Sequence, residues 1–265
     1  MIRQNDFIAI LKSLGLHKGD TVMVHSALSG LGVIEGVSQD NPKAYCRAIF
    51  DLFDRTIGIT KGFGTLIVPT FTHDYVRKET AFYLERSSSE CGIFSEYVRK
   101  LPGSFRTLHP INSLSIIGKN KKFFKRISTS SYGINSSFEI LTKIKNAKIV
   151  YLGAKLSHTT LVHHVEHLIG VSYIYNKAYF KPAVYVKGKK IEHPFFCAVR
   201  YLNGKVEITY EPLKEELIKR KLLKIRKIGN SEIMMANVNR VIEIAYNMLQ
   251  NDQCVFLKNK FYTTE

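Results

Sequence analysis

The highest density of chemically useful side chains lies in residues 157–167, which carry four histidines and one glutamate. His163 and Glu166 are three residues apart, a spacing that places two side chains on the same face of a helix. A carboxylate beside an imidazole fixes the imidazole tautomer and stabilises the imidazolium ion, as a general base requires. The segment therefore favours a proton-accepting site centred on His163.

Two other interpretations of these histidines stay open. His163 and His167 are four residues apart, as metal ligands on one helix are, but the segment reads HHVEH and lacks the HExxH order. A third ligand would have to come from His109 or Asp74. Histidines also occur as ordinary packed side chains, and spacing alone does not separate these three alternatives.

Three further segments place polar residues next to predicted strands. His25–Gly32 follows the β-branched run TVMVH, and residues 70–74 follow the apolar run TLIVP. The third segment, 106–110, precedes a predicted strand at 114–118. Ligands of α/β proteins bind beyond the carboxyl ends of the strands, so these segments are candidates for binding. None is a GxGxxG fingerprint or a Walker loop, and no GxSxG nucleophile elbow occurs, so covalent serine catalysis has little support.

Strands that alternate with helices are expected to position these segments. Four apolar or β-branched runs predict strands at 21–25, 65–69, 114–118 and 148–152. Helical patterns predict helices at 7–14, 42–57, 94–101, 137–144 and 159–169. Asp6 is expected to cap the first helix and Gly15 to end it. This alternation is typical of an α/β layered fold.

Beyond residue 170 the pattern changes to short aromatic and β-branched pieces separated by Gly and Pro. These pieces predict antiparallel strands, attached to the main sheet, at 173–180, 183–186, 190–193 and 206–210. The run Lys214–Arg226 predicts a helix with a solvated face, and a last helix is expected at about 234–249. We therefore predict one α/β domain over residues 1–265, with a central mixed β-sheet flanked by helices and extra antiparallel strands in the C-terminal third.

The composition argues against several classes of protein. The chain is 45% hydrophobic and 23% charged, which is typical of a folded globular protein and not of a disordered one. No apolar run reaches the roughly 18 residues of a membrane span, and no signal peptide is visible, so a cytoplasmic protein is expected. The four cysteines include no CxxC pair, which argues against a zinc ribbon and favours buried thiols.

The formal net charge of +17 indicates attraction to anionic partners. The charges are spread along the chain, with local clusters at 119–125 and 214–227. No helix-turn-helix, zinc-finger or RNP signature occurs, so no nucleic-acid partner is expected. A lysine excess also arises in proteins of AT-rich genomes, where it has no functional meaning. The alternative is attraction of a small anionic ligand such as a nucleotide cofactor.

Six motifs occur in a specific order along most of the chain: VHSALSGLG (24–32), GTLIVPTFT (64–72), CGIFSEYVRKLPGSFRTLHPINSLSIIG (91–118), YGINSSFEIL (132–141), TLVHHVE (160–166) and a glycine followed by a helix (229–248). In this order they resemble the aminoglycoside N3-acetyltransferase family, the acetyl-CoA-dependent "antibiotic NAT" group, which does not have the GNAT fold. Thr107 replaces the usual Ser, Ser137 stands where Pro is typical, and the loop 37–41 lacks a second family Gly. His164 is an extra neighbour of the motif histidine, as in the branch found among surface-polysaccharide genes.

The resemblance implies direct acetyl transfer from acetyl-CoA, as cosubstrate, to an amine in a ternary complex, without a metal. His163 would be the general base, and Glu166 would orient it. The implied residues for acetyl-CoA are His25, Ser26, Ala27, Leu28, Ser29, Thr72, His109 and Ser113. The residues expected to contact the acceptor are Phe71, Asp74, Glu96 and His164. Ser113 and Ser136 are also explained by capping or turn formation alone.

The charge of the chain bears on the acceptor. Aminoglycosides are polycations, whose recruitment by a chain of net charge +17 is unfavourable, whereas a nucleotide-linked amino sugar carries a diphosphate. We therefore expect N-acetylation of a dTDP- or UDP-linked amino sugar for surface polysaccharide, with an aminoglycoside as the alternative acceptor. A non-catalytic anion-binding protein and a zinc hydrolase using His109, His163 and His167 are further alternatives. The oligomeric state stays open, with a homodimer as one option.

Overall fold

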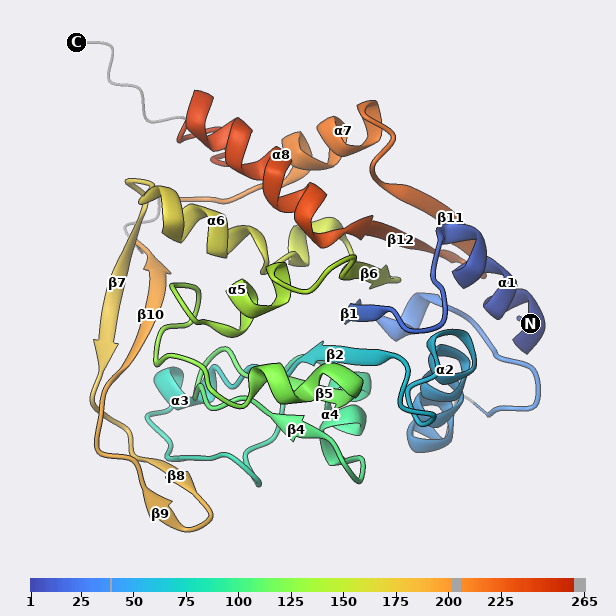
Figure 1. The fold of residues 1–265 in the computed structure, drawn as a ribbon, viewed down its shortest axis with the longest axis horizontal. Helices are drawn as coiled ribbons and strands as arrows, with labels where there is room; N and C mark the ends of the chain where they lie inside the picture. The colour runs from blue at the N-terminus through green and yellow to red at the C-terminus, as the bar shows by residue number, and fades with distance from the viewer. Residues whose placement is uncertain (39, 202–205, 260–265) are drawn as a thin grey trace.

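A seven-stranded mixed sheet, in the order β11-β12-β6-β1-β2-β5-β4, forms the centre of the protein (Figure 1). The structure is a computed structural model that describes residues 1–38, 40–201 and 206–259. The three central strands are parallel: β6 (Lys148–Leu152), β1 (Thr21–Ser26) and β2 (Thr65–Pro69). The outer strands are antiparallel to their neighbours: β12 (Ser231–Asn237), β11 (Lys224–Ile228), β5 (Leu114–Gly118) and β4 (Phe105–Arg106).

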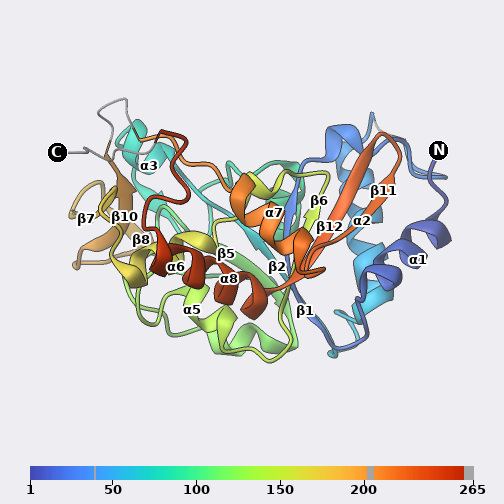
Figure 2. The ribbon, with the colours of Figure 1, turned by 90° about the horizontal axis from the view of Figure 1, so that it is seen from above.

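Helices cover both faces of this sheet (Figures 1 and 2). One layer contains α1 (Gln4–Leu14), α2 (Pro42–Ile57) and α4 (Ile93–Lys100). The other contains α5 (Ser137–Thr142), α6 (Val162–Ile169), α7 (Glu211–Lys219) and α8 (Val238–Asn251). Side chains alternate between the two faces of a strand. Val22 and Val24 of β1 therefore pack against the layer of α1, α2 and α4, and Met23 packs against the layer of α5 to α8. The predicted fold, a mixed sheet between helices, is confirmed.

Two small sheets lie apart from the main one and build the end of the molecule next to residue 163. In the first, β7 (Ile174–Tyr179) pairs antiparallel with β10 (Phe195–Arg200). The second contains β3 (Phe82–Tyr83), β8 (Val184–Val186) and β9 (Lys189–Lys190). The short helix α3 (Asp74–Arg77) lies beside the β7–β10 pair in both views. A separate apolar cluster joins these pieces: Tyr75, Phe82, Ile111, Val184, Phe195 and Cys197.

The structure corrects the prediction for the C-terminal third. The strands β7 to β10 do not join the main sheet, and 206–210 is no strand but a single bridge between Ile208 and Leu257. The helix predicted over 214–226 ends at Lys219, and the main sheet instead receives β11 and β12. Met234 therefore lies in β12, and the last helix begins at Val238. The residues Met234, Met235 and Ala236 of β12 are apolar and lie just before a helix, so the sequence pattern assigned them to that helix.

The first helix is also longer than predicted. It begins at Gln4, and Arg3 occupies the N-cap position. Asp6 therefore does not cap the helix but lies in its first turn, where it accepts a hydrogen bond of 2.8 Å from the Arg3 guanidinium. Gly15 ends the helix in the left-handed conformation, with φ at 103°, as predicted.

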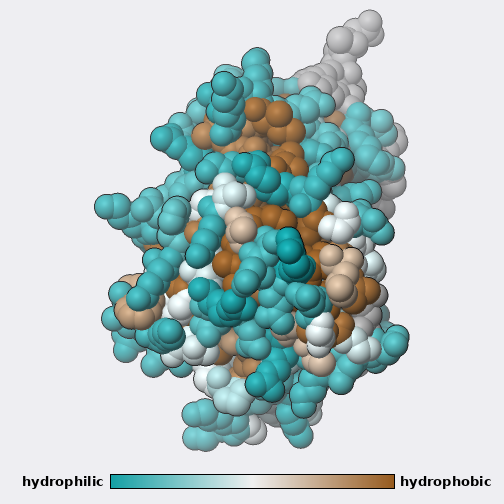
Figure 3. Space-filling view, turned by 90° about the vertical axis from the view of Figure 1, so that its right-hand side faces the viewer, coloured by the Kyte–Doolittle hydropathy of each residue, from teal (hydrophilic) through white to brown (hydrophobic). Residues whose placement is uncertain are grey.

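The surface at the α1 and α2 end is mainly hydrophilic (Figure 3). Hydrophobic side chains show between hydrophilic ones near the top and the centre of this view, without forming one continuous face. None of the helices in the described part of the chain combines the length and the apolar character needed to cross a bilayer.

Gly153 holds the polar segment after β1 against the end of β6. Its φ is +67°, and a Cβ atom at this position would lie 2.3 Å from the carbonyl oxygen of Ala27. The Ala27 amide in turn donates to the Leu152 carbonyl at 2.9 Å. Close backbone approach of this kind requires a glycine, so the 26–32 segment depends on Gly153 for its position.

We expect Gly153→Ala to lower the free energy of unfolding by more than about 2 kcal/mol, because both the positive φ and the clash oppose a side chain. Gly188→Ala is the matched control, since Gly188 has a φ of +77° but open space around it. It should cost only about 1 kcal/mol. Urea unfolding of both variants measures the difference, and equal losses would show that the contact with Ala27 is unimportant.

Candidate functional site

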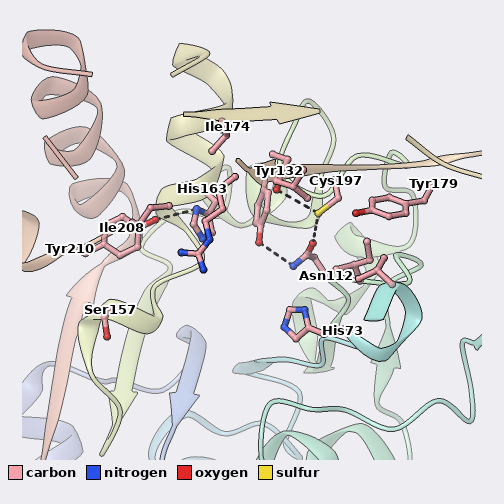
Figure 4. Close-up of a pocket in the computed structure, with 15 residues that line it drawn as sticks. His73, Asn112, Tyr132, Ser157, His163, Ile174, Tyr179, Cys197, Ile208 and Tyr210 are labelled. Carbon is pink, nitrogen blue, oxygen red and sulfur yellow. Dashed lines mark hydrogen bonds between the residues drawn. The ribbon is translucent and has the colours of Figure 1, made fainter. Parts of the chain in front are cut away.

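The candidate site is a cavity of about 380 Å³ between α6, the β7–β10 pair and the segments that follow β2 and precede α7 (Figure 4). Its walls combine aromatic, hydrophobic and polar side chains from segments far apart in the sequence. The polar or aromatic members labelled in the figure are His73, Asn112, Tyr132, Ser157, His163, Tyr179, Cys197 and Tyr210. Concave sites of this size, with few convergent polar groups, are typical of small-molecule binding.

His163 is the histidine of the 157–167 segment that lines this cavity. Its Nδ1 lies 2.6 Å from Glu166 Oε2 and 3.1 Å from the hydroxyl of Tyr210. Because a carboxylate only accepts, Nδ1 carries the proton that it donates to Glu166. In the part of the chain that the structure describes, Nε2 has no hydrogen-bond partner, so it is the ring nitrogen with a lone pair for a substrate.

Glu166 is completely buried behind this imidazole. Its Oε1 accepts hydrogen bonds from the hydroxyls of Tyr173, at 2.9 Å, and Tyr210, at 3.3 Å. Burial and the charge of Glu166 raise the pKa of both phenols, which therefore stay protonated and act as donors. Since no lysine or arginine of the described residues pairs with Glu166, an imidazolium at His163 is the cation placed to balance it.

The adjacent His164 has a different environment. It is buried, and its Nδ1 hydrogen-bonds to the main-chain carbonyl of Tyr132. Burial lowers the pKa of His164 and favours its neutral form. The contact expected between His164 and an acceptor has no counterpart in the cavity wall, so of the two neighbours the geometry favours His163 as the base.

His109 does not contribute to the cavity either. Its Nδ1 accepts from the amides of Ile111, at 3.2 Å, and Asn112, at 2.9 Å, while Nε2 donates to the Phe196 carbonyl at 3.2 Å. Both ring nitrogens are thus committed to the main chain, and burial lowers the pKa to about 4. His109 therefore fixes a turn against β10, and neither ring nitrogen is left to ligate a metal with His163 and His167. Among the described residues, no three His, Cys, Asp or Glu side chains are grouped as metal ligands.

Thr72 and Ser113 are held by the buried guanidinium of Arg106. Arg106 donates to Thr72 Oγ1 and to Ser113 Oγ, both at 2.9 Å, and to the Thr70 carbonyl at 2.6 Å. Burial lowers the pKa of Arg106 to about 9, which leaves it charged at neutral pH. These two hydroxyls therefore stabilise the segment after β2, and Ser136 caps α5 by accepting from the Glu139 amide. The capping interpretation thus accounts for Ser136, whereas Ser113 Oγ bridges the Arg106 guanidinium and the Thr70 carbonyl.

Phe71, Asp74 and Glu96 lie outside the cavity lining. Phe71 is buried, with its ring edge-on to His73 at a centroid distance of 6.1 Å. Asp74 begins α3 and pairs with Lys78 at 2.8 Å. Burial opposes ionisation of Glu96, but hydrogen bonds from Arg99 and the Ser89 amide prevail and lower its pKa to about 2. Glu96 is thus a structural ion-pair residue, and the structure does not bring it to an acceptor.

His25 and Ser26 end β1, and Ala27, Leu28 and Ser29 form the turn that follows; none of the five lines the His163 cavity. The His25 ring stacks on Tyr151 at 5.7 Å, and burial, with a smaller effect of His158, lowers the pKa of His25 to about 3. Two buried polar atoms, His25 Nε2 and Thr160 Oγ1, have no partner within the described residues, whereas the hydroxyls of Tyr151 and Thr159 lie close enough to interact with each other. The first two leave unused hydrogen-bonding capacity beside Ser157, which lines the cavity.

A second cavity, of about 650 Å³, adjoins this segment. Gly153 and Ser231, which lie against Ala27 and Gly30, line it together with Lys155, Lys214 and Lys227. Its lining ends at Leu156 and Glu211, the immediate neighbours of Ser157 and Tyr210 in the first cavity. The two cavities are thus lined in part by consecutive residues, at 156–157 and 210–211.

Several residues of the cavity wall, and Tyr173 behind it, were missed by the sequence analysis. Tyr173 and Tyr210 were assigned to predicted strands, and nothing in their local sequence indicates contact with Glu166. Asn112 and Cys197 form a hydrogen bond of 3.3 Å on the cavity wall. Burial raises the pKa of Cys197 to about 11, so this thiol is protonated at neutral pH and is a poor nucleophile.

Comparison with known proteins gives a consistent result. The family model described as aminoglycoside 3-N-acetyltransferase matches residues 23–250. The SPbeta prophage-derived aminoglycoside N(3')-acetyltransferase-like protein YokD of Bacillus subtilis is 23% identical and is aligned over 94% of this chain and 92% of its own. The crystal structure of aminoglycoside acetyltransferase AAC(3)-Xa superimposes with a TM-score of 0.78, at 21% identity, over 94% of this chain and 92% of its own. AAC-IIIb, in a binary complex with CoASH, gives a TM-score of 0.76 at 21% identity, over 97% and 98% of the two chains. The structural likenesses show a shared fold.

We expect the free energy of unfolding to decrease as the pH falls from about 6.5 to about 5. Burial lowers the pKa of His25 to about 3 and that of His109 to about 4 in the folded chain, against an ordinary value of 6.5. Between pH 6.5 and 5 these two imidazoles therefore take up protons only in the unfolded chain. Each histidine should contribute up to about 1.4 kcal/mol per pH unit. Urea unfolding across this pH range measures the slope.

The control for this prediction uses one buried and one exposed histidine. His109→Asn keeps an acceptor for the turn amides but cannot titrate, so it should reduce the slope by up to one proton. His17→Asn, at an exposed position, should leave the slope unchanged. An unchanged slope in His109→Asn would contradict the assignment of a neutral, buried imidazole.

Proposed function

The chain belongs to the aminoglycoside 3-N-acetyltransferase family, and from this premise we propose that it transfers the acetyl group of acetyl-CoA directly to an amine, with His163 as the general base. The observation that carries the proposal is the His163 imidazole itself. Its Nδ1 is bonded to a fully buried carboxylate, and its Nε2 has no partner among the described residues of the cavity. This arrangement fixes the tautomer needed to accept a proton.

The chemistry requires one proton to move as one bond forms and another breaks. A protonated amine has no lone pair, so the amine reacts in its neutral form, and its nitrogen gives one of its two protons to Nε2 as it attacks the thioester carbonyl carbon. The carbon–sulfur bond then breaks, and the imidazolium returns the proton to the departing thiolate, giving an amide and free CoA. Glu166 stabilises the intermediate imidazolium, because its negative charge is buried within hydrogen-bonding distance of Nδ1.

Acetyl-CoA fits the side of the site formed by the 25–29 segment and the second cavity. Lys155, Lys214 and Lys227 outnumber the two carboxylates of that cavity's lining, those of Glu211 and Glu232, and suit the phosphates of CoA. The unpartnered donors and acceptors beside Ser157 suit the amide groups of the pantetheine arm, which leads towards His163. Of the residues expected to contact acetyl-CoA, this placement supports the 25–29 segment and leaves His109 and Ser113 in structural roles.

The acceptor is an amine of an amino sugar in this proposal. The names of the relatives favour an aminoglycoside, and the comparisons offer no support for a nucleotide-linked sugar or a role in polysaccharide synthesis. Assays with acetyl-CoA and each class of acceptor, followed by mass spectrometry of the product, test the reaction and identify the acetylated amine.

We expect His163→Gln to reduce kcat by roughly 10²- to 10⁴-fold, because glutamine cannot take up the amine proton. The KM for acetyl-CoA should change little, since His163 is not needed to hold the CoA phosphates. Thiol release, measured with a thiol reagent and a saturating acceptor, gives both constants.

His158→Gln is the matched control, as His158 lies in the same segment but is exposed and does not line the cavity. It should keep kcat within about twofold of the original chain. Full activity of His163→Gln would refute the proposed base, whereas equal losses in both variants would point to a disturbed segment.

A further inference from the structure

A large groove continues from the His163 cavity on the side away from the proposed acetyl-CoA position. It measures about 1110 Å³ and lies between α3 and the β7–β10 pair. The groove and the cavity share five lining residues: His73, Val76, Tyr179, Val199 and Arg200. A molecule that presents an amine to His163 from this side would therefore place its remaining part in the groove.

The charge of the groove is strongly asymmetric. Five of its lining residues are cationic and one, Glu79, is acidic. The cations are Arg77, Lys177, Lys181, Lys190 and Arg200. Lys190 pairs with Glu192 at 3.1 Å, but Arg77, Lys177 and Lys181 form no ion pair within the described chain. Among the described residues, the lining of the smaller cavity around His163 includes no carboxylate.

Aromatic side chains accompany these cations. Tyr175 and Tyr179 line the groove from β7, and Phe180, which follows them, is 76% exposed. The Lys177 ammonium group lies 5.1 Å from the centroid of the Tyr179 ring. Cations interleaved with exposed rings are suited to a ligand that combines phosphate with a flat or sugar ring.

We propose that this groove binds a phosphate group of the acceptor, so that the amine acetylated at His163 belongs to a phosphate-bearing molecule and not to a polycation. The inference rests on the proposed acetyl transfer and names its acceptor class. A polycationic acceptor would have to lie against four or five positive charges, with a single carboxylate to offset them. A diphosphate placed between Arg77 of α3 and Lys177 of β7 would instead meet cations from both walls.

CoA also carries phosphates, and the experiment must separate the two sources. Uridine diphosphate is the probe, and its binding to the full chain is measured by calorimetry with and without saturating CoA. We expect it to bind in the presence of CoA, because the groove is distinct from the cavity assigned to CoA. The double variant Arg77→Gln/Lys177→Gln should weaken this binding about tenfold, with the same KM for acetyl-CoA.

The matched control is Lys12→Gln/Lys43→Gln, which removes the same charge from α1 and α2 at exposed positions without ion pairs among the described residues. It should leave binding of uridine diphosphate unchanged. Loss of that binding on addition of CoA, or equal weakening in both double variants, would overturn the proposal. Kanamycin turnover that exceeds that of every phosphate-bearing amine tested would overturn it too.

Failure of this inference is distinguishable from failure of the proposed function. If His163→Gln keeps full activity while uridine diphosphate still binds the groove, the base assignment is wrong and the binding site stands. If acetyl transfer depends on His163 but the groove variant binds uridine diphosphate normally, the reaction stands and the acceptor class is wrong.

Discussion

The buried carboxylate of Glu166 is the constraint on which the site depends. A fully buried negative charge is costly unless donors surround it, and here the donors are an imidazole and two phenols. They come from α6, from Tyr173 after the end of α6, and from Tyr210 just before α7. Three separate segments must therefore meet around one carboxylate, and the packing of α6, α7 and α8 in a shared core brings them together.

A second buried charge organises the opposite wall. Among the described residues, Arg106 has no carboxylate as a hydrogen-bonding partner; it donates to hydroxyls and to main-chain carbonyls of the segments after β2 and before α4. Those segments have little regular secondary structure, so some of their main-chain carbonyls lack a backbone partner. The guanidinium of Arg106, which has five N–H donors, supplies hydrogen bonds to these carbonyls. The result is a rigid wall that carries His73 and Asn112 at the cavity.

The sequence predicted those parts of the site that depend on local geometry. Contact between His163 and Glu166 follows from their spacing on a helix, and the strands β1, β2 and β6 follow from apolar runs that end near polar segments. Tyr210 escaped prediction because it reaches Glu166 from 44 residues further along the chain, and Tyr173, seven residues from Glu166, because it lies beyond the end of α6, where helical spacing no longer applies. His109 and Glu96 were predicted to bind ligands because their side chains are chemically versatile. In the structure, His109 hydrogen-bonds to main-chain groups and Glu96 to Arg99. In the last third, the charged and apolar residues of 214–237 fit a helix or a strand equally well. Pairing of β12 with β6, and of β11 with β12, decides for strands, and this pairing is a tertiary contact that the local sequence does not contain.

The two proposals place the reaction and the recognition of the acceptor at different ends of the molecule. The base, its carboxylate and the proposed acetyl-CoA side are tied to the main sheet and its helices, where a charge change would disturb buried groups. The groove beside α3 is built by small sheets that do not join the main sheet, and its cations are exposed. Exposed charges there can change at little cost in stability while they alter which molecules enter. Family membership therefore constrains the chemistry at His163 more tightly than it constrains the molecule that carries the amine.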